Sequence, residues 1–411
     1  MSNTPQIRFA GFTDAWEQRK VSEITEFHKQ GFYTTEAYDE SKKYYLLRGT
    51  DLTDNRLVLK GTPKIDATEK DYQAFKTQIG DFLIVRSGTV GTYGIVYDDI
   101  PAIFGSYLID FRFDKSLVVN EFFGYFYQSD LFKNQLRQII QQSANTNINA
   151  ENIKSTSIKL PSLSEQNKIA NFFTQLDSLI TLHQRKCDAL QKFKKSMLQK
   201  MFPQNGESVP EIRFAGFTDA WEQRKFSELT EIRSASRVHK DEWQSSGVPF
   251  YRSSDVMAAL NGTENEKAFI SEELYEKLSA VSGKLEKGDV LVTGGGSVGK
   301  PYIVPNNEPL YTKDADLLWI KNNENLDPYF VYTFFFSPTF TDYLNSVSHV
   351  GTIAHYTITQ LGETPITLPC VSEQQKIGDY FRNLDFLITL HQRKLETLQK
   401  MKKSLLQKMF V

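Results

Sequence analysis

The sequence predicts an α+β protein in which one two-part unit is written twice, with a mixed α/β module followed by a long helix in each copy. The segment IRFAGFTDAWEQRK at residues 7–20 recurs unchanged at residues 212–225, 205 positions later. LITLHQRK at residues 179–186 recurs at residues 387–394, 208 positions later. Solenoid repeats are much shorter, about 20–50 residues. The repeat therefore indicates a duplicated domain with pseudo-two-fold symmetry.

The bulk composition is typical of a globular protein. The chain has 411 residues, of which 40% are hydrophobic and 24% are charged, and this balance argues against disorder. No apolar run is long enough for a transmembrane helix and no secretory signal is visible. Cys187 and Cys370 make no metal-ligand pattern and fit a reducing cytoplasm. With a net charge of -2, a nucleic-acid binder must gather its positive charge on one face.

The repeats divide the chain into six predicted parts. Two segments of unlike sequence lie between the repeated elements, yet GDFLIVRSGTVG at residues 80–91 aligns with GDVLVTGGGSVG at residues 288–299. This predicts one fold that carries two different surfaces. The parts are a repeat element at 1–20, the first module at 21–160, a central spacer helix at 161–203, a linker with the second repeat element at 204–225, the second module at 226–368 and a C-terminal spacer helix at 369–411.

The modules read as mixed α/β structure. Short β-rich runs such as DFLIV, YGIVY, VLVTG, YIVP and DLLWI are separated by Gly, Pro, Asn and Asp, a pattern typical of strands and turns. Residues 120–140 and 327–347 are aromatic and longer, and we expect helix there. In the repeated openers, the aromatic residues are expected to be core residues that hold each opener to the scaffold: Phe9, Phe12, Trp16, Phe214, Phe217 and Trp221.

The spacer segments read as long helices. Apolar residues recur at alternating intervals of three and four over about four heptads, with charges on the other faces, which predicts a coiled-coil pair. Ser164 and Ser372 are the expected starts. His183 and His391 fall on the seam, where a polar residue fixes register, and we prefer that role to catalysis. The predicted seam comprises Leu176, Ile180, His183, Leu190, Leu384, Ile388, His391 and Leu398.

The opener RFAGFTDAWEQRK, the closer SEQ-x-KI…LD-x-LITLHQRK…LQK-x-KKS-x-LQKMF and their duplication around two unlike segments resemble the DNA-specificity subunit of a type I restriction-modification enzyme. The resemblance covers essentially the whole chain. It implies two target-recognition domains that each read one half of a bipartite, asymmetric site in double-stranded DNA. It also implies that the two long helices pack antiparallel and hold these domains apart.

The same resemblance implies the partners and their chemistry. Two modification (methyltransferase) subunits would methylate adenine, and restriction (translocase and nuclease) subunits would cleave DNA. S-adenosylmethionine, ATP and Mg would be cofactors of those partners, and none is expected in this chain. The residues agree, since the chain contains no Pro-Pro dipeptide and so no N-P-P-[YF] methyltransferase motif, and its six histidines make no metal spacing. We expect neither a catalytic residue nor a metal site.

GGGSVGK at residues 294–300 is close to the nucleotide-binding pattern G-x-x-x-x-G-K-[ST]. Pro301 stands where that loop needs a hydroxyl for Mg²⁺, and the residues after it read as a strand rather than a helix. An NTPase is therefore not expected. A different alternative, a coiled-coil scaffold with two modules that bind no nucleic acid, stays open from the residues alone.

Three pairs of matched stretches supply candidate DNA contacts. Arg48 and Arg252 occupy equivalent positions, and each either contacts DNA or pairs with the nearby Asp51 or Asp255. The glycine loops either offer backbone N–H groups to a phosphate or are tight turns. The polar stretches before the spacer helices either contact DNA or a modification subunit, or anchor the chain. The candidates are Arg48, Arg86, Ser87, Thr89, Asn145, Asn147, Arg252, Ser253, Ser297, Lys300, His349, His355 and Tyr356.

Overall fold

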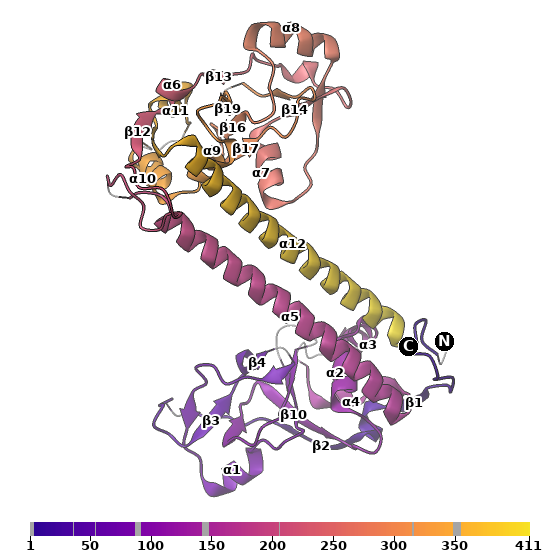
Figure 1. The fold of residues 1–411 in the computed structure, drawn as a ribbon. Helices are drawn as coiled ribbons and strands as arrows, with labels where there is room; N and C mark the ends of the chain where they lie inside the picture. The colour runs from indigo at the N-terminus through magenta and orange to yellow at the C-terminus, as the bar shows by residue number, and fades with distance from the viewer. Residues whose placement is uncertain are drawn as a thin grey trace. The chain divides into compact units, whose positions relative to one another are not determined.

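The computed structural model describes residues 4–411 except 36, 54, 87–91, 142–147, 205, 315 and 348–354. It divides into two compact units, one made of Met1–Gln184 with Gln392–Val411 and the other of Arg185–His391. The boundaries fall inside the two long helices, α5 (Leu163–Lys200) and α12 (Val371–Met409) (Figure 1). Each unit therefore contains one module and a part of each long helix. No helix of the described residues is long and apolar enough to cross a membrane.

The described residues of unit 1 form three sheets. A six-stranded sheet has the order β2-β10-β7-β8-β5-β4, a three-stranded sheet the order β6-β3-β9, and β1 pairs with β11. The strands are β1 (Glu17–Lys20), β2 (Thr25–Gln30), β3 (Tyr44–Leu47), β4 (Leu52–Thr53), β5 (Arg56–Leu57), β6 (Lys64–Ile65), β7 (Phe82–Val85), β8 (Tyr93–Ile95), β9 (Ala102–Phe104), β10 (Leu108–Phe113) and β11 (Ser157–Leu160). The helices are α1 (Glu69–Phe75), α2 (Asn120–Gln128), α3 (Asp130–Gln141) and α4 (Ala150–Lys154), with 3-10 turns at Val21–Glu23 and Gly49–Asp51.

Unit 2 repeats this plan with a four-stranded sheet in place of the six-stranded one. Its sheets have the orders β13-β19-β16-β17, β15-β14-β18 and β12-β20. The strands are β12 (Glu222–Lys225), β13 (Ile232–Ser234), β14 (Val248–Tyr251), β15 (Ala268–Ile270), β16 (Val290–Thr293), β17 (Pro301–Ile303), β18 (Tyr311–Thr312), β19 (Leu317–Ile320) and β20 (Pro365–Leu368). The helices are α6 (Phe226–Leu229), α7 (Ser253–Asn261), α8 (Glu272–Ser282), α9 (Pro328–Phe334), α10 (Pro338–Val347) and α11 (Ile358–Glu363), with a 3-10 turn at Lys240–Glu242.

The central strand pairs show that the two modules share one fold. Val85 of β7 faces Leu108 of β10, and the equivalent Thr293 of β16 faces Leu317 of β19, both in antiparallel pairing. β3 pairs in parallel with β9, as β14 does with β18. Their fully buried Val, Ile, Leu and Phe residues explain why these runs read as strands in the sequence. The predicted common skeleton is thus present.

The core of each module includes residues from the C-terminal end of a long helix: α12 for the first module and α5 for the second. In neither case is this the helix that directly follows the module in the sequence. In unit 1, the buried Trp16 ring lies 5.9 Å from Phe122 and 6.5 Å from Phe410, just beyond α12. In unit 2, the equivalent Trp221 lies 5.8 Å from Phe330 and 6.0 Å from Phe202, just beyond α5. Full burial of one such aromatic ring contributes about 1.5–3 kcal/mol. The helix ends are therefore part of the cores.

The repeated openers are tied to the starts of the long helices. The Arg8 guanidinium donates from two nitrogens to the Glu165 carboxylate, both at 2.8 Å, and Arg213 does the same to Glu373 at 2.7 and 2.8 Å. Both carboxylates are buried, where such bidentate ion pairs are strong and specific in geometry. The Phe9 ring also lies 5.8 Å from Phe172 of α5. These contacts fit the expected clip.

The long helices begin one residue before the predicted Ser164 and Ser372. Ser162, just ahead of α5, accepts a hydrogen bond from the Glu165 N–H at 3.4 Å, the role of an N-terminal cap. The cap is therefore Ser162, and Ser164 lies within the first turn. In the second copy Cys370 stands at the equivalent place.

The two helices run antiparallel within each unit. In unit 1, Phe173 of α5 lies near Phe410 and Asp177 pairs with Lys402 at 2.7 Å. In unit 2, Phe202 lies near Phe381, and Lys194 pairs with Asp385 at 2.5 Å. In both units, residue numbers rise along one helix as the numbers of their contact partners fall along the other. Asp385 is the repeat equivalent of Asp177, so the same ion pair is formed in each unit.

Most of the predicted seam is buried. Leu176, Leu384, Ile388 and Leu398 are at most 8% exposed. Ile180 and Leu190 are half-buried and pack against the cores of units 1 and 2. His183 and His391 are half-buried and both have an interaction partner. Their role in fixing register stays a prediction.

Candidate nucleic-acid interface

Three stretches that are distant in sequence meet at the same place in each unit. In unit 1, the Arg86 N–H donates to the Tyr107 carbonyl at 2.9 Å, and the Ile148 N–H donates to the Arg86 carbonyl at 3.2 Å. In unit 2, the Gly294 N–H donates to the Asp316 carbonyl at 2.8 Å, and the Tyr356 N–H to the Gly294 carbonyl at 2.7 Å. The residue that precedes each glycine loop, Arg86 or Gly294, is thereby held between the approach to β10 or β19 and the stretch that leads to α4 or α11.

In unit 1 this place borders a groove of about 530 Å³. Its lining includes Tyr33, Tyr38 and Tyr107, which are 74%, 58% and 69% exposed. Tyrosine combines a broad apolar ring with a hydroxyl that hydrogen-bonds, which suits it to recognition surfaces. The sequence interpretation did not include these residues. The available indication was the occurrence of aromatic residues in polar, glycine-flanked stretches, GFYTTEAY and GSYL.

The two matched arginines form the ion pairs that the sequence offered as the structural alternative. Arg48 donates from its backbone N–H to Asp51 Oδ2 at 2.7 Å and holds the same oxygen with Nε at 3.5 Å. Arg252 pairs with Asp255 at 2.9 Å, and its guanidinium lies 5.5 Å from the Trp243 ring centroid. Arg48 lines the groove with 42% of its side chain exposed, against 19% for Arg252. Arg48 therefore keeps more surface for a ligand.

Arg86 lies at the start of the first glycine loop. It is half-buried, one terminal nitrogen donates to the Ser106 carbonyl at 3.4 Å, and Nε is buried without a hydrogen-bond partner among the described residues. The predicted contacts Ser87, Thr89, Asn145, Asn147 and His349 lie outside the described residues.

The second glycine loop is a tight connection from β16 to β17. The Gly299 N–H donates to the Thr293 carbonyl at 2.8 Å, and the Lys300 N–H donates to Thr293 Oγ1 at 2.8 Å. Gly296 and Gly299 have φ of +70° and +75°, which disfavours side chains. A Cβ at Gly299 would also lie 2.7 Å from the Phe340 ring. A strand follows the loop, so it lacks the helix that a nucleotide-binding loop opens.

Polar side chains gather around this second loop. Ser297 is exposed on it, and His355 is exposed beside it, with its Nδ1 3.7 Å from where a Cβ of Gly295 would be. Ser253, the first residue of α7, is half-buried and donates to the Asp316 carbonyl at 3.0 Å. Lys300 is half-buried, and its ammonium lies 5.9 Å from the Phe336 ring centroid. Of these four residues, Ser297 and His355 are the most exposed to solvent and therefore the most accessible to a ligand.

The burial of Tyr356 favours the anchoring alternative over a contact with DNA. Its side chain is only 2% exposed, its ring lies 6.2 Å from Phe340, and its hydroxyl hydrogen-bonds with Thr364. Burial raises the pKa of the Tyr356 hydroxyl well above its usual value. The equivalent residue in unit 1, Ile148, is also buried. This position anchors the polar stretch to the core.

The chain matches a known family model twice. The model is described as the type I restriction modification DNA specificity domain, and it matches residues 13–192 and 218–400. A putative specificity subunit, MjaX, from Methanocaldococcus jannaschii is 24% identical over 427 residues, which span 98% of this chain and 95% of that protein. The putative specificity subunit S.HindORF215P from Haemophilus influenzae is 29% identical over 178 residues, which span 41% and 43% of the two chains.

Solved structures show the same fold. The crystal structure of the type I restriction-modification S subunit from M. genitalium superimposes with a TM-score of 0.62 at 16% identity and covers 99% of each chain. A chain from a study of type I complex assembly and conformational transition has a TM-score of 0.50 at 16% identity, covering 95% of this chain and 96% of that one. These structures show the fold, and the two matches to the family model, which span most of the sequence, show that the chain belongs to the family of type I restriction-modification DNA specificity subunits.

Proposed function

We propose that each module of this chain reads one half of a bipartite, asymmetric site in double-stranded DNA. The observation that carries the proposal is the pair of equivalent positions, Arg86 and Gly294, which are held by the same pattern of backbone hydrogen bonds but are surrounded by different side chains. A shared frame positions both modules on DNA in the same way, whereas unlike side chains select unlike sequences. The duplication then accounts for a site in two parts, because related domains contact duplex DNA at separate places.

The two surfaces offer different chemistry to DNA. The first presents the aromatic groove of Tyr33, Tyr38 and Tyr107 beside Arg48, whose guanidinium suits guanine or a phosphate. The second presents the hydroxyl of Ser297 and the imidazole of His355, which suit base edges or phosphates. Arg86, Ser87, Thr89, Asn145, Asn147, Ser253, Lys300 and His349 remain candidate contacts of the same two surfaces.

We further propose that the long helices set the gap between the half-sites and dock two modification subunits. Leu179 and Leu182 of α5 are both 46% exposed, and their repeat equivalents on α12, Leu387 and Leu390, are 41% and 50% exposed. Apolar residues that stay exposed in this repeated way indicate a contact surface. Because the set occurs twice, it suits two copies of one partner.

In this proposal the chain is the non-catalytic subunit of a complex. The modification subunits would transfer a methyl group from S-adenosylmethionine to adenine, and restriction subunits that use ATP and Mg would cleave the DNA. The cytoplasm is the compartment in which such a complex would meet DNA.

Exchanging one module tests the proposal. A chain whose residues 21–160 are replaced by the corresponding segment of another specificity subunit should, with its modification partner, methylate a motif that differs in one half only. Sequencing of methylated DNA from the host cell reads the motif directly. Exchange of residues 226–368 is the matched control and should change the other half. A change in both halves, or in neither, would contradict the modular reading of DNA, and absence of salt-sensitive DNA binding would favour the scaffold alternative.

A further inference from the structure

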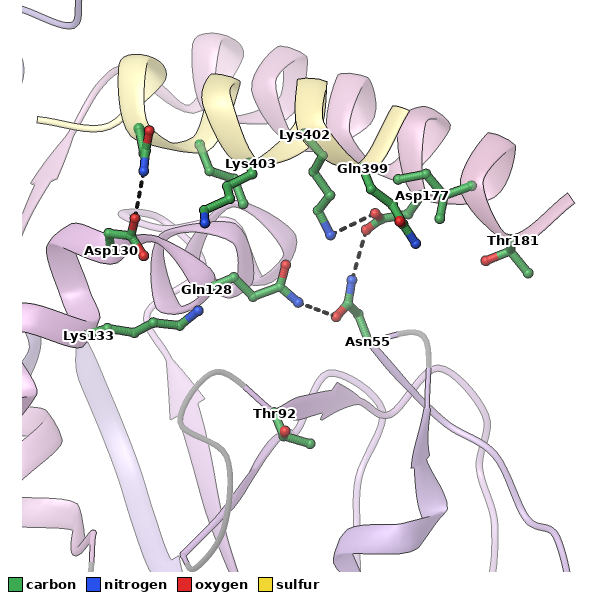
Figure 2. A pocket seen from close by; sticks show the side chains of 13 residues that line it. Asn55, Thr92, Gln128, Asp130, Lys133, Asp177, Thr181, Gln399, Lys402 and Lys403 are labelled. Atoms are coloured by element: carbon green, nitrogen blue, oxygen red, sulfur yellow. Dashed lines mark hydrogen bonds and ion pairs between the residues drawn. The ribbon is translucent and has the colours of Figure 1, made fainter. Parts of the chain in front are cut away.

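A second pocket of unit 1, of about 590 Å³, lies where the first module meets α5 and α12 (Figure 2). Its walls include Gln128 and Lys133 from α2 and α3, Asp177 from α5, and Lys402 and Lys403 from α12. This volume lies within the usual range for ligand sites, roughly 300–1,000 Å³. The pocket is separate from the tyrosine-lined groove, since no residue lines both.

The carboxylates of this pocket are already engaged. Asp177 accepts from Lys402 at 2.7 Å, from the Asn55 amide at 3.0 Å and from the Tyr125 hydroxyl at 3.0 Å. Asp130 accepts from the Gln407 amide at 2.7 Å. Carboxylates that already accept hydrogen bonds and ion pairs from neighbouring side chains attract a further cation only weakly. The pocket therefore does not favour a metal ion or a positively charged ligand.

Two cations of the pocket remain available. The side chains of Lys133 and Lys403 reach into the space between the module and the helix pair from opposite sides (Figure 2). Neither ammonium has a hydrogen-bond or ion-pair partner in the part of the chain that the structure describes. An ammonium carries three donors and no acceptor. The groups left to recognise a ligand are thus donors with positive charge, which suit an anion rich in oxygen.

The repeat provides an internal comparison, because unit 2 has the same helix residues without the same module residues. Asp385, Lys194 and Lys195 are the equivalents of Asp177, Lys402 and Lys403, but Phe336 stands in place of Gln128 and Thr341 in place of Lys133. The Lys194 ammonium lies 5.2 Å from the Phe336 ring centroid, a cation–π contact. The polar pocket thus depends on residues of the first module.

We propose that this pocket binds a phosphate group through Lys133 and Lys403. The proposal deepens the proposed function, on which it rests for the source of the phosphate: a backbone phosphodiester of the duplex that the first module reads. Lysines bind phosphates as point charges through charge-assisted hydrogen bonds, and such contacts position a protein on DNA without reading sequence. The site would add a phosphate contact at the first half-site that the second half-site lacks, and would so strengthen the binding of the complex to DNA there.

Salt-dependent DNA binding and phosphate stabilisation test this site. The chain assembled with its modification subunits would be titrated with its duplex at several salt concentrations, as wild type, as Lys133→Ala/Lys403→Ala and as Lys195→Ala, the equivalent of Lys403 in unit 2. The double variant should bind all duplexes more weakly and lower the salt slope by about 0.9 for each phosphate that it no longer neutralises. Lys195→Ala should change the slope less. Gln128→Phe introduces the residue that unit 2 has at this position of the pocket wall. It keeps both lysines but replaces the polar wall by an aromatic ring, so it should act like the double variant.

A second arm uses the full-length chain alone and measures its melting temperature in inorganic phosphate and in chloride of equal ionic strength. Stabilisation by phosphate that is absent in the double variant, with an unchanged salt slope for DNA, would assign the pocket to a free phosphate. If the double variant equals wild type in both arms, or if Lys195→Ala has the same effect, the proposal is overturned. The methylated motif is a separate readout, so a failure of the DNA-reading proposal would be recognised independently.

Discussion

Asp110 illustrates at the residue scale how the two copies of one fold have diverged. It lies in β10 with no exposed surface, beside the buried Asp81, and one guanidinium serves both carboxylates: Arg112 contacts Asp81 at 2.7 Å and Asp110 at 3.3 Å. Burial and then the Asp81 charge raise the pKa of the Asp110 carboxyl. In unit 2 the same register position holds Trp319, so the second module has one buried carboxylate here, Asp289, rather than two.

Replacing Asp110 by Asn should therefore stabilise unit 1, and the gain should depend on pH. The ionised form is disfavoured by folding, so wild-type stability falls as the pH rises from the unfolded pKa, about 3.9, through the raised folded value. We expect little gain for Asp110→Asn near pH 4 and a gain of about 1–3 kcal/mol near pH 8. Hydrogen exchange of β10 peptides at both pH values measures it.

Asp81→Asn is the control for this prediction. Asp81 also accepts from the Gln78 N–H at 2.7 Å, so its loss should destabilise unit 1 where the loss of Asp110 does not. A gain from Asp110→Asn that is the same at both pH values would show that the buried charge is not the cause.

Single residues also mark the limit of what the sequence could predict for the site. Arg48 and Arg252 could be matched to Asp51 and Asp255, because those partners lie three residues away. Tyr356 could not be recognised as a core residue, since the stretch around it is polar and its burial depends on a distant Phe340. The exposed tyrosines of the groove were missed for the converse reason: among 19 tyrosines, only the tertiary structure selects those that remain at the surface.

At the scale of elements, long periodic segments were predictable and short ones were not. The long helices differ from the predicted starts by one residue each, because their pattern extends over many turns. Residues 120–140 form two helices rather than one, since Ser129 donates to the Phe126 carbonyl at 2.6 Å and accepts from the Phe132 N–H at 3.2 Å. The two-residue strands β4, β5 and β6 are too short to show an alternating pattern.

The exposed leucines of the long helices lead to a prediction about assembly. Leu179→Asp with Leu182→Asp should leave the fold intact, because both side chains are largely exposed, but should prevent one modification subunit from docking. Adding Leu387→Asp and Leu390→Asp should prevent the second. The subunit ratio of the purified complex, measured by native mass spectrometry, should fall from two to one and then to none. Ser178→Asp, an exposed neighbour, should leave the ratio at two, and an unchanged ratio in the leucine variants would place the docking surface elsewhere.

At the scale of the whole molecule, the physical units differ from the parts that the repeats suggest. Each core is completed by an aromatic residue from the end of the other long helix, Phe410 in unit 1 and Phe202 in unit 2. The chain therefore divides within the helices, between residues 184 and 185 and between residues 391 and 392. Helical periodicity identifies a buried face but not the partner that covers it, so the sequence could not predict these boundaries.

Under the proposed function, this construction should make the gap between the half-sites adjustable through the helices. Seven residues inserted into the middle of both α5 and α12 preserve the heptad pattern of the seam and the pairs Asp177–Lys402 and Lys194–Asp385, each of which lies within one unit. Seven helical residues add about 10.5 Å, or roughly three base pairs at about 3.4 Å each. The methylated motif should keep both halves and gain about three base pairs between them.

Two controls show whether the helices themselves set the gap. An insertion into one helix alone moves its seam residues out of register with those of the other helix. This variant should therefore lose stability and methylation rather than change the gap. The same seven residues placed in the linker at 203–210, which follows α5, should leave the motif unchanged because no long helix is extended. If the insertion into both helices left the gap at its original length, the spacing would have to come from the partner subunits, since the modules are unchanged and the heptad pattern of the seam is preserved in that variant. An altered half-site would contradict the assignment of each half-site to one module.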